Sequence, residues 1–370
     1  MNKAKHNVPI PENLLITSTM VFFLIHSMQV GVGLLGFERY IAMAAGYDAW
    51  ISILIAGLVI HLLLWMIYRI LELSGGDLVS IHEFVFGKYI GSLMNMVFSL
   101  YFLLLSLTVL RTFIEVIQVW VFPQLNVWWY ALAFLVMVYY FVEGGLRVIT
   151  GMCLISVLLG LPLLLFKFFP IQLGQVDNLY PLIDHSLMDL LASAKTTTLS
   201  FLGFELLLMF YPFLKNQQES KKWAHFGAFY TTMIYLASAL VAFVYYSEEQ
   251  LQFVTWGTIS MWKIVDFPFL QRFEYAGIAL WAYVVLPNIC IGLWAASRIP
   301  KRMFKKIKQR YVIWLYSLIL LVASALLETR SMIDQLNTIT SQIGFYVLLY
   351  IPFLFVMMLF MKKVMKRDEN

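Results

Sequence analysis

Apolar residues run along this chain in long blocks that short polar stretches separate. The blocks lie at residues 13–45, 48–70, 90–120, 127–142, 147–170, 190–214, 223–246, 270–298, 311–328 and 340–361. A helix needs roughly 20 apolar residues to cross the hydrocarbon core of a bilayer. The pattern therefore predicts ten transmembrane helices, joined by short loops into a single transmembrane domain over residues 1–370.

The composition supports a membrane protein. Hydrophobic residues make up 61% of the chain and charged residues 13%, with a mean hydropathy of +0.80. Soluble domains have about 45–50% apolar and about 25% charged residues, so we expect the lipid bilayer to be the solvent of this chain. The apolar run from Leu14 has no cleavage pattern after it, and we expect it to be retained as the first span.

The basic residues are distributed unevenly between the two ends of the predicted spans. With the N-terminus in the cytoplasm, nineteen of the 26 Lys and Arg residues lie at cytoplasmic ends, six lie on the opposite side, and Arg111 lies inside a span. Cytoplasmic loops of membrane proteins carry an excess of Lys and Arg. The distribution predicts that both termini are cytoplasmic, and it assigns the net charge of +5 to these loops rather than to a nucleic-acid interface.

Two of the blocks, half a chain apart, are interrupted by glycine. Gly31-Val32-Gly33 interrupts the first block and Ser200-Phe201-Leu202-Gly203-Phe204-Glu205 the sixth, and four further blocks follow each of them. The chain thus divides into repeats at about 13–170 and 190–361, which must insert with opposite topology because each has five helices. Many transporters are built on this plan. We therefore expect an all-α integral membrane fold with ten transmembrane helices, a 5+5 inverted repeat and broken helices 1 and 6, as in leucine-transporter-like proteins.

The first interruption has the properties of a ligand site. In a bilayer, an unwound segment is tolerated only where it lines a cavity or is buried in protein, and its free N–H and carbonyl groups can bind the carboxylate and ammonium of a small molecule. The candidate residues are Gln29, Gly31, Val32 and Gly33. The alternative is a small-residue packing face, which is common in membrane helices.

The second interruption supplies a matching set of candidates. They are Leu199, Ser200, Phe201, Gly203 and Glu205. An ionisable residue in mid-membrane is costly and is a functional candidate for that reason. Glu205 is predicted to hold a proton, to bind an ammonium or to pair with Arg111. The alternative is a structural carboxylate that accepts hydrogen bonds from the broken helix.

The third block contributes polar residues along its length. Arg111 and Glu115 are four residues apart and share one helix face, so they form either a local ion pair, which we favour, or a gate above the site. Tyr101 and Thr108 lie deeper on the same helix and are candidates for lining the pocket. No catalytic triad, phosphate-binding loop or metal-ligand spacing is found in the sequence, and we expect neither an enzyme nor a bound metal or cofactor.

Several motifs follow one another over nearly the whole chain. They are Gly31-Val32-Gly33-Leu34-Leu35, Ala45-Gly46-Tyr47-Asp48-Ala49-Trp50-Ile51-Ser52, Phe86-Gly87-Lys88-Tyr89-Ile90-Gly91, the second interruption with Pro212-Phe213-Leu214-Lys215, and Thr255-Trp256 with Phe267-Pro268-Phe269-Leu270-Gln271-Arg272-Phe273-Glu274. Their combination resembles the B-type subunit of bacterial spore germinant receptors, in the amino acid–polyamine–organocation permease superfamily. The chain departs from the family pattern where Gly36-Phe37-Glu38-Arg39 replaces the usual proline and where Gln271 replaces the usual acidic residue.

The resemblance implies a protein of the spore inner membrane that binds a small germinant, usually an amino acid. It also implies two partners, an A-type membrane subunit and a C-type lipoprotein. Residues that sodium-coupled members of this architecture use are absent: the eighth block has no Ser, Thr or Asp between Phe273 and Ala296. A sensing subunit is therefore the leading interpretation. The alternatives are a proton-coupled amino-acid permease, with Glu205 as the proton carrier, and a structural scaffold with a vestigial pocket.

Overall fold

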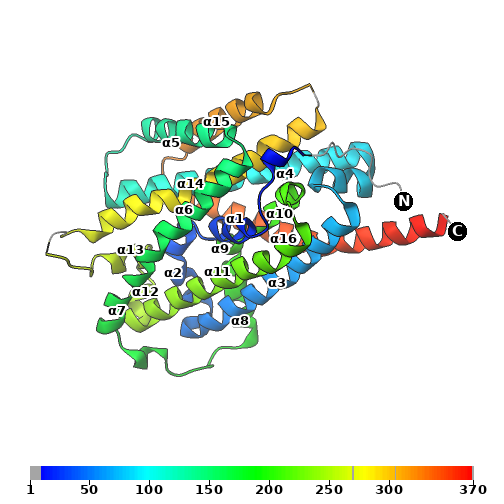
Figure 1. Cartoon of the computed structure of the whole chain (residues 1–370). Helices are drawn as coiled ribbons and strands as arrows, with labels where there is room; N and C mark the ends of the chain where they lie inside the picture. Colours follow the sequence, from blue (N-terminus) through cyan, green and yellow to red (C-terminus); the bar gives the residue numbers. More distant parts are fainter. Residues whose placement is uncertain (1–9, 269–270, 305, 369–370) are drawn as a thin grey trace.

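A computed structural model of the chain describes residues 10–268, 271–304 and 306–368, and throughout those residues it is built of helices joined by turns and short loops (Figure 1). Some sequence-based assignments lie outside these residues: the basic residues Lys3, Lys5 and Lys305, the motif residue Phe269, and the predicted start of the eighth block at Leu270. Within the described residues the extended pairing is one isolated bridge between Ile16 and Leu214.

Each of the ten predicted blocks contains helix. The blocks correspond in order to α1 (Met20–Gln29) with α2 (Phe37–Ala45), α3 (Ala49–Ser74), α4 (Leu78–Trp120), α5 (Val127–Glu143), α6 (Leu146–Leu165) with α7 (Phe168–Leu173), α8 (Leu187–Thr196) with α9 (Thr198–Phe201) and α10 (Leu207–Phe210), α11 (Gln217–Tyr245), α14 (Phe273–Met303), α15 (Gln309–Leu326) and α16 (Arg330–Asp368). Two short helices, α12 (Glu248–Leu251) and α13 (Gly257–Trp262), occupy the loop before α14.

Helix length and apolarity identify fewer spans than the ten blocks. Among the described residues, seven helices are long and apolar enough to cross a membrane, and the pair formed by Leu187–Thr196 and Thr198–Phe213, bent by 56°, makes an eighth candidate. The helices α1 and α5 are apolar but shorter. The chain is therefore a multi-pass helical membrane protein, and the count of ten and the inverted repeat stay predictions.

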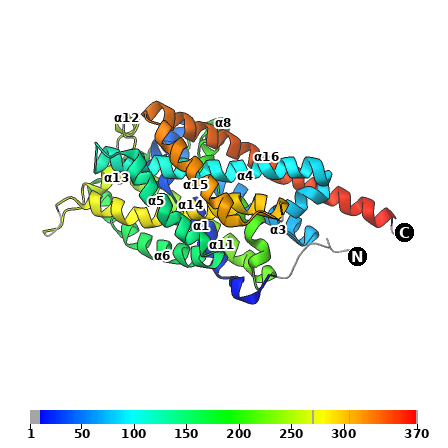
Figure 2. The ribbon, with the colours of Figure 1, turned by 90° about the horizontal axis from the view of Figure 1, so that it is seen from above.

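The short helix α1 lies at the centre of the bundle. It packs against α11, α6 and α14, and α14 in turn packs along much of α4 (Figure 1). The helices α5 and α15 lie side by side on the outside of this group, as both views show (Figure 2). The broken segments are thus enclosed by long helices on several sides, as a segment with free backbone groups requires in a membrane.

The two ends of the bundle differ in the contacts that close them. At the end where the N- and C-terminal parts of the chain lie, here the N-terminal end (Figures 1 and 2), the Ile16 N–H donates to Phe213 O at 2.9 Å and the Lys215 N–H donates to Ile16 O at 3.0 Å. Asp77 caps α4 there and also forms an ion pair with Arg302 at 2.8 Å. The opposite end, here the far end, carries the loop of residues 174–186 and the helices α12 and α13.

Short helical segments occupy two of the connections between the blocks. Residues 78–86 form the first part of α4, which bends at Gly87, where φ is +75°. A positive φ of this kind favours glycine because a Cβ would be strained. The loop after the seventh block contains α12 and α13.

Candidate ligand site at the two helix breaks

The first break follows directly from the glycine pair. The helix α1 ends at Gln29, Val30 is extended, and a 3₁₀ turn over Val32–Leu35, η2, leads into α2. The free carbonyls of this segment accept hydrogen bonds from side chains of other helices. Asn288 Nδ2 on α14 donates to Ser27 O at 2.7 Å and to Met28 O at 3.2 Å.

Two further carbonyls of the first break are satisfied in the same way. The Tyr235 hydroxyl on α11 donates to Gln29 O at 3.0 Å, and Trp281 Nε1 on α14 donates to Gly31 O at 3.3 Å. These contacts replace the backbone hydrogen bonds that unwinding removes, so the broken segment is stabilised within the protein interior.

The second break is organised by Glu205. After α9 the chain turns at Gly203, where φ is +111°, into the 3₁₀ turn Phe204–Leu206, η5. The fully buried Glu205 carboxylate accepts from the Gly203 N–H at 2.8 Å and from the Tyr101 hydroxyl of α4 at 2.7 Å. The carboxylate therefore links the second break to α4, and its hydrogen-bond partners among the described residues are Gly203 and Tyr101 rather than Arg111.

The two breaks lie against each other. Gln29 Nε2 donates to Phe201 O at 3.0 Å across them. A Cβ on Gly33 would lie 3.0 Å from Ser200 Oγ, and a Cβ on Gly203 would lie 2.7 Å from Met28 Cβ. Glycine at both positions permits this close approach, so candidate residues from two halves of the chain form one continuous region.

Two buried acceptor atoms in this region have no partner among the described residues. They are Gln29 Oε1 and Asn288 Oδ1. The amide nitrogens of both side chains face backbone carbonyls, so exchanging O and N would set two acceptors against each other, and the unpaired atoms are the oxygens. Buried acceptors without a donor are costly, and a ligand that brings N–H groups would satisfy them.

The remaining predicted residues are distributed differently. Tyr101 joins the region through Glu205, and Val32 and Leu199 lie buried or partly buried in the core around it. Thr108 instead donates to Leu104 O at 2.9 Å and pairs with Thr340 of α16 at 2.8 Å. It therefore joins α4 to α16 and is not part of the two breaks.

Arg111 and Glu115 have different direct partners, although their charges still act on each other. Arg111 donates to Leu327 O at 2.7 Å and to Gln118 Oε1 at 3.3 Å, whereas Glu115 pairs with Arg330 at 2.8 Å. The helix spacing puts the two side chains on one face, but the start of α16 supplies a better-placed guanidinium for the carboxylate. Both residues therefore fix α4 to the α15–α16 connection.

Sequence reasoning missed Asn288, Tyr235 and Trp281, whose side chains satisfy the first break. Asn288 had a readable signal, because it is an amide in an otherwise apolar block, where an intramembrane polar group needs a partner. Tyr235 and Trp281 had none, since aromatic residues are frequent throughout this chain.

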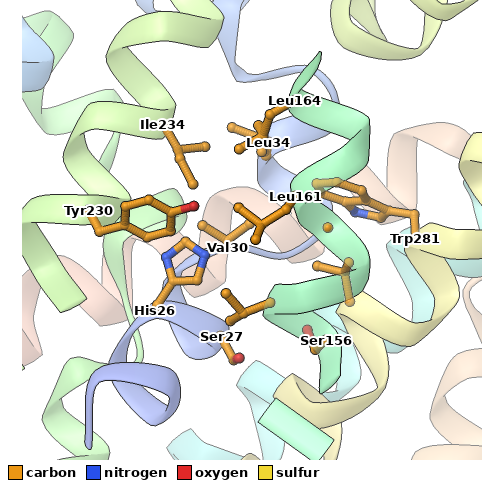
Figure 3. A pocket seen from close by; sticks show the side chains of 13 residues that line it. His26, Ser27, Val30, Leu34, Ser156, Leu161, Leu164, Tyr230, Ile234 and Trp281 are labelled. Atoms are coloured by element: carbon orange, nitrogen blue, oxygen red, sulfur yellow. The ribbon is translucent and has the colours of Figure 1, made fainter. Parts of the chain in front are cut away.

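A small cavity lies beside the first break (Figure 3). Its volume is about 20 Å³ and its lining comes from α1, α6, α11 and α14. His26, Tyr230 and Trp281 surround it, with Val30 and Leu34 contributed by the break itself (Figure 3). A buried water needs ~10–15 Å³ of such space, so the cavity holds about one water molecule and is too small for an amino acid.

One cluster at the far end has the atoms for a metal ion. The side-chain donor atoms of Asp48, Asp184 and His185 lie within 4.8 Å of one another. However, the Asp48 carboxylate already accepts from the N–H groups of Ile183 and Asp184 at 2.7 and 2.8 Å. Burial disfavours the charged form of His185, but its hydrogen bonds to Asp48 and Asp184 outweigh that effect and raise the pKa of His185. We interpret the cluster as a clamp on the loop before α8.

The chain is similar to proteins of spore germination over most of its length. The family described as spore germination protein matches residues 15–333. Spore germination protein GerQB of Bacillus cereus is 41% identical over 348 residues, which cover 94% of this chain and 96% of that protein. Spore germination protein B2 of Bacillus subtilis (strain 168) is 26% identical, over 74% of this chain and 73% of its own length.

Two solved structures share the fold. MhsT in complex with L-phenylalanine superposes with a TM-score of 0.65 at 13% identity and covers 93% of this chain and 88% of its own. A mutant manganese transporter of Eremococcus coleocola superposes with a TM-score of 0.62 at 14% identity and covers 95% and 81%. At such identities the likeness concerns the fold alone, and it confirms the all-helical, transporter-like architecture.

Proposed function

Because the chain belongs to the spore germination protein family, we propose that it is the ligand-binding B-type subunit of a spore germinant receptor. In this role it senses a small nutrient in the spore inner membrane and passes the signal to an A-type membrane subunit and a C-type lipoprotein. The similarity to GerQB over nearly the full length of both chains supports the assignment. The proposed activity is binding and signalling rather than an enzymatic reaction.

The ligand site in this proposal is the paired break, and the ligand carries an ammonium group. The observation that carries this step is the pair of unsatisfied acceptors, Gln29 Oε1 and Asn288 Oδ1, in a region without a basic side chain among the candidate residues. An ammonium has three donors and no acceptor, so it complements two amide oxygens. An amino acid fits this requirement, which agrees with the ligand class that the family resemblance implies.

The topology in the proposal follows the sequence pattern. Ten spans arranged as a 5+5 inverted repeat would place both termini on the same side of the membrane, and the pairing of the two breaks supports this arrangement. The basic residues Lys215, Arg298 and Arg302 at the N-terminal end of the bundle favour the cytoplasm as that side. The far end would face the outside, from which a germinant arrives.

A ligand screen on the purified receptor complex tests the proposal, with thermal shift as the measurement. Neutral amino acids should raise the melting temperature, because a ligand that binds only the folded state stabilises it. The variant Gln29→Met, which keeps the length of the side chain but removes the acceptor together with the donor to Phe201 O, should abolish that shift. Gln172→Met, at an exposed position on α7, is the matched control and should retain it. Stabilisation by sugars or nucleosides alone would refute the ammonium-based ligand class.

The second candidate function is a proton-coupled amino-acid permease, which the transporter-like fold favours. In a permease, Glu205→Gln should abolish uptake driven by a pH gradient into proteoliposomes while ligand binding persists. In a receptor, the parent protein shows no uptake at permease rates, and Glu205→Gln weakens binding because Gly203 and Tyr101 both donate to this carboxylate. Sustained uptake by the parent protein would refute the pure receptor.

A further inference from the structure

Three polar side chains that the proposed site does not use meet inside the far end. Glu38 lies on the first turn of α2, Lys167 lies between α6 and α7, and Thr258 lies on α13. The Thr258 hydroxyl donates to Glu38 Oε1 at 2.6 Å, and Lys167 Nζ donates to Thr258 Oγ1 at 3.5 Å. Three elements that are distant in sequence are therefore joined at one point.

All three side chains are buried. Their exposed fractions are 0% for Glu38, 8% for Lys167 and 2% for Thr258. The charge of Lys167 acts on Glu38 across the threonine. Glu38 Oε2 has no hydrogen-bond partner among the described residues and faces Gly257, where a Cβ would lie 3.2 Å away. Gly257 thus leaves room for a carboxylate that is fully enclosed.

These residues sit where α2 and α13 close over the first break. The helix α13 packs against η2, α2 and α14. Its Trp262 ring contacts the ring of Trp281 with centroids 5.8 Å apart, and Trp281 donates to Gly31 O. The residue before α2, Gly36, also lies very close to the loop that precedes α13, because a Cβ on Gly36 would clash with Thr255 O. A route from the far end to Gly31 therefore has to separate α13 from α2.

We propose that Glu38, Thr258 and Lys167 form a charge-compensated latch, which leaves the far end closed over the first break as long as the two buried charges balance each other. Burying both charges is tolerated because each offsets the other, whereas removing one leaves an uncompensated buried charge. Opening the far end gives both groups access to water, so the open state has no such penalty. The latch therefore sets the balance between closed and open states, and it rests on the proposed function in placing the ligand route at this end.

A thiol-accessibility measurement tests the latch without any ligand. The background variant Cys153→Ala/Cys290→Ala removes both native cysteines, and Val32→Cys places a reporter at the first break. The protein is reconstituted in proteoliposomes and treated with a membrane-impermeant maleimide. Glu38→Gln and Lys167→Met should each raise the labelling rate by at least about tenfold. Each variant leaves one unpaired buried charge in the closed state, which lowers the stability of that state relative to the open state and so raises the open population without any ligand.

The double variant Glu38→Gln/Lys167→Met is the decisive arm, because it leaves neither charge unpaired and should label within about threefold of the parent. The matched control is Glu274→Gln. Glu274 forms an ion pair with Arg272 at the start of α14, and this pair does not connect two separate helices. It should label at the parental rate.

Parental rates in both single variants, or a double variant that labels as fast as the single ones, would overturn the latch. If one single variant does not fold, the comparison of the other single variant with the double variant decides. If the labelling rates are as expected but no amino acid raises the melting temperature of the receptor complex, the result counts against the ligand site and not against the latch.

Discussion

The substitution Gly203→Ala tests whether the second break depends on glycine. Gly203 has φ +111° and ψ −22°, and a residue with a Cβ in such a region costs of order 1–3 kcal/mol. The new Cβ would also lie 2.7 Å from Met28 Cβ and 3.2 Å from Met28 O. Forcing an extra group into a packed interior costs typically ~1–3 kcal/mol. The two effects together amount to about 2–6 kcal/mol, a large part of the ~5–15 kcal/mol that stabilises a typical protein.

Thermal unfolding of the purified protein in detergent measures this cost. A loss of about 2–6 kcal/mol corresponds to a drop in Tm of roughly 4–24 °C, at about 2–4 °C per kcal/mol for larger domains. The control is Gly151→Ala within α6, where nothing lies within 4 Å of the new Cβ. Alanine is favoured over glycine inside a helix by about 0.5–1 kcal/mol, so the control should be neutral or stabilising. Equal melting temperatures for the two variants would refute the reasoning.

Two further predictions concern the contact between the breaks and the loop at the far end. Gly33→Ala should lower stability by about 1–3 kcal/mol through overpacking against Ser200 Oγ, and adding Ser200→Ala should recover most of that loss in the same unfolding assay; equal stability of the single and double variants would contradict the contact. The pKa of His185 is raised in the folded state by Asp48 and Asp184, so its contribution is fully present below the unfolded pKa of about 6.5 and is lost as pH rises through the folded pKa. The Tm of the parent should fall over that interval more than the Tm of His185→Gln; parallel pH profiles would exclude the clamp.

The positions of the helices could be predicted well from the sequence because the bilayer imposes a strong condition. Every helix of the bundle needs a run of apolar residues, and the ten blocks contain helices in the predicted order. The ends were less accurate where a helix continues outside the apolar zone. The helix α16 begins at Arg330, ahead of the predicted 340. Its first turns contain polar residues such as Asp334 and Thr338, which are compatible with a helix but are not part of an apolar block.

The candidate site, like the fold, could be predicted only in part. The two breaks could be predicted because two interruptions that contain glycine recur half a chain apart, whereas a single glycine such as Gly151 lies inside an unbroken helix. The partners of the charged residues could not be predicted, since they depend on tertiary approach. Glu115 is four residues from Arg111 but pairs with Arg330, and Glu38 is enclosed by Lys167 and Thr258, which no periodicity relates to it. A departure from the family pattern at Glu38 was visible in the sequence, but its burial was not.

The contacts at the two ends bear on how a ligand reaches the breaks. The cavity of about 20 Å³ beside the first break cannot admit an amino acid, so binding requires one end of the bundle to open. Opening the N-terminal end breaks the backbone hydrogen bonds of Ile16 and the ion pair between the partly exposed Arg302 and the buried Asp77. Opening the far end transfers the buried charges of Glu38 and Lys167 into water, and their hydration offsets part of the contacts that are lost. We therefore infer that the far end is the end that opens, and that the charge balance of this buried pair sets how readily the first break is exposed.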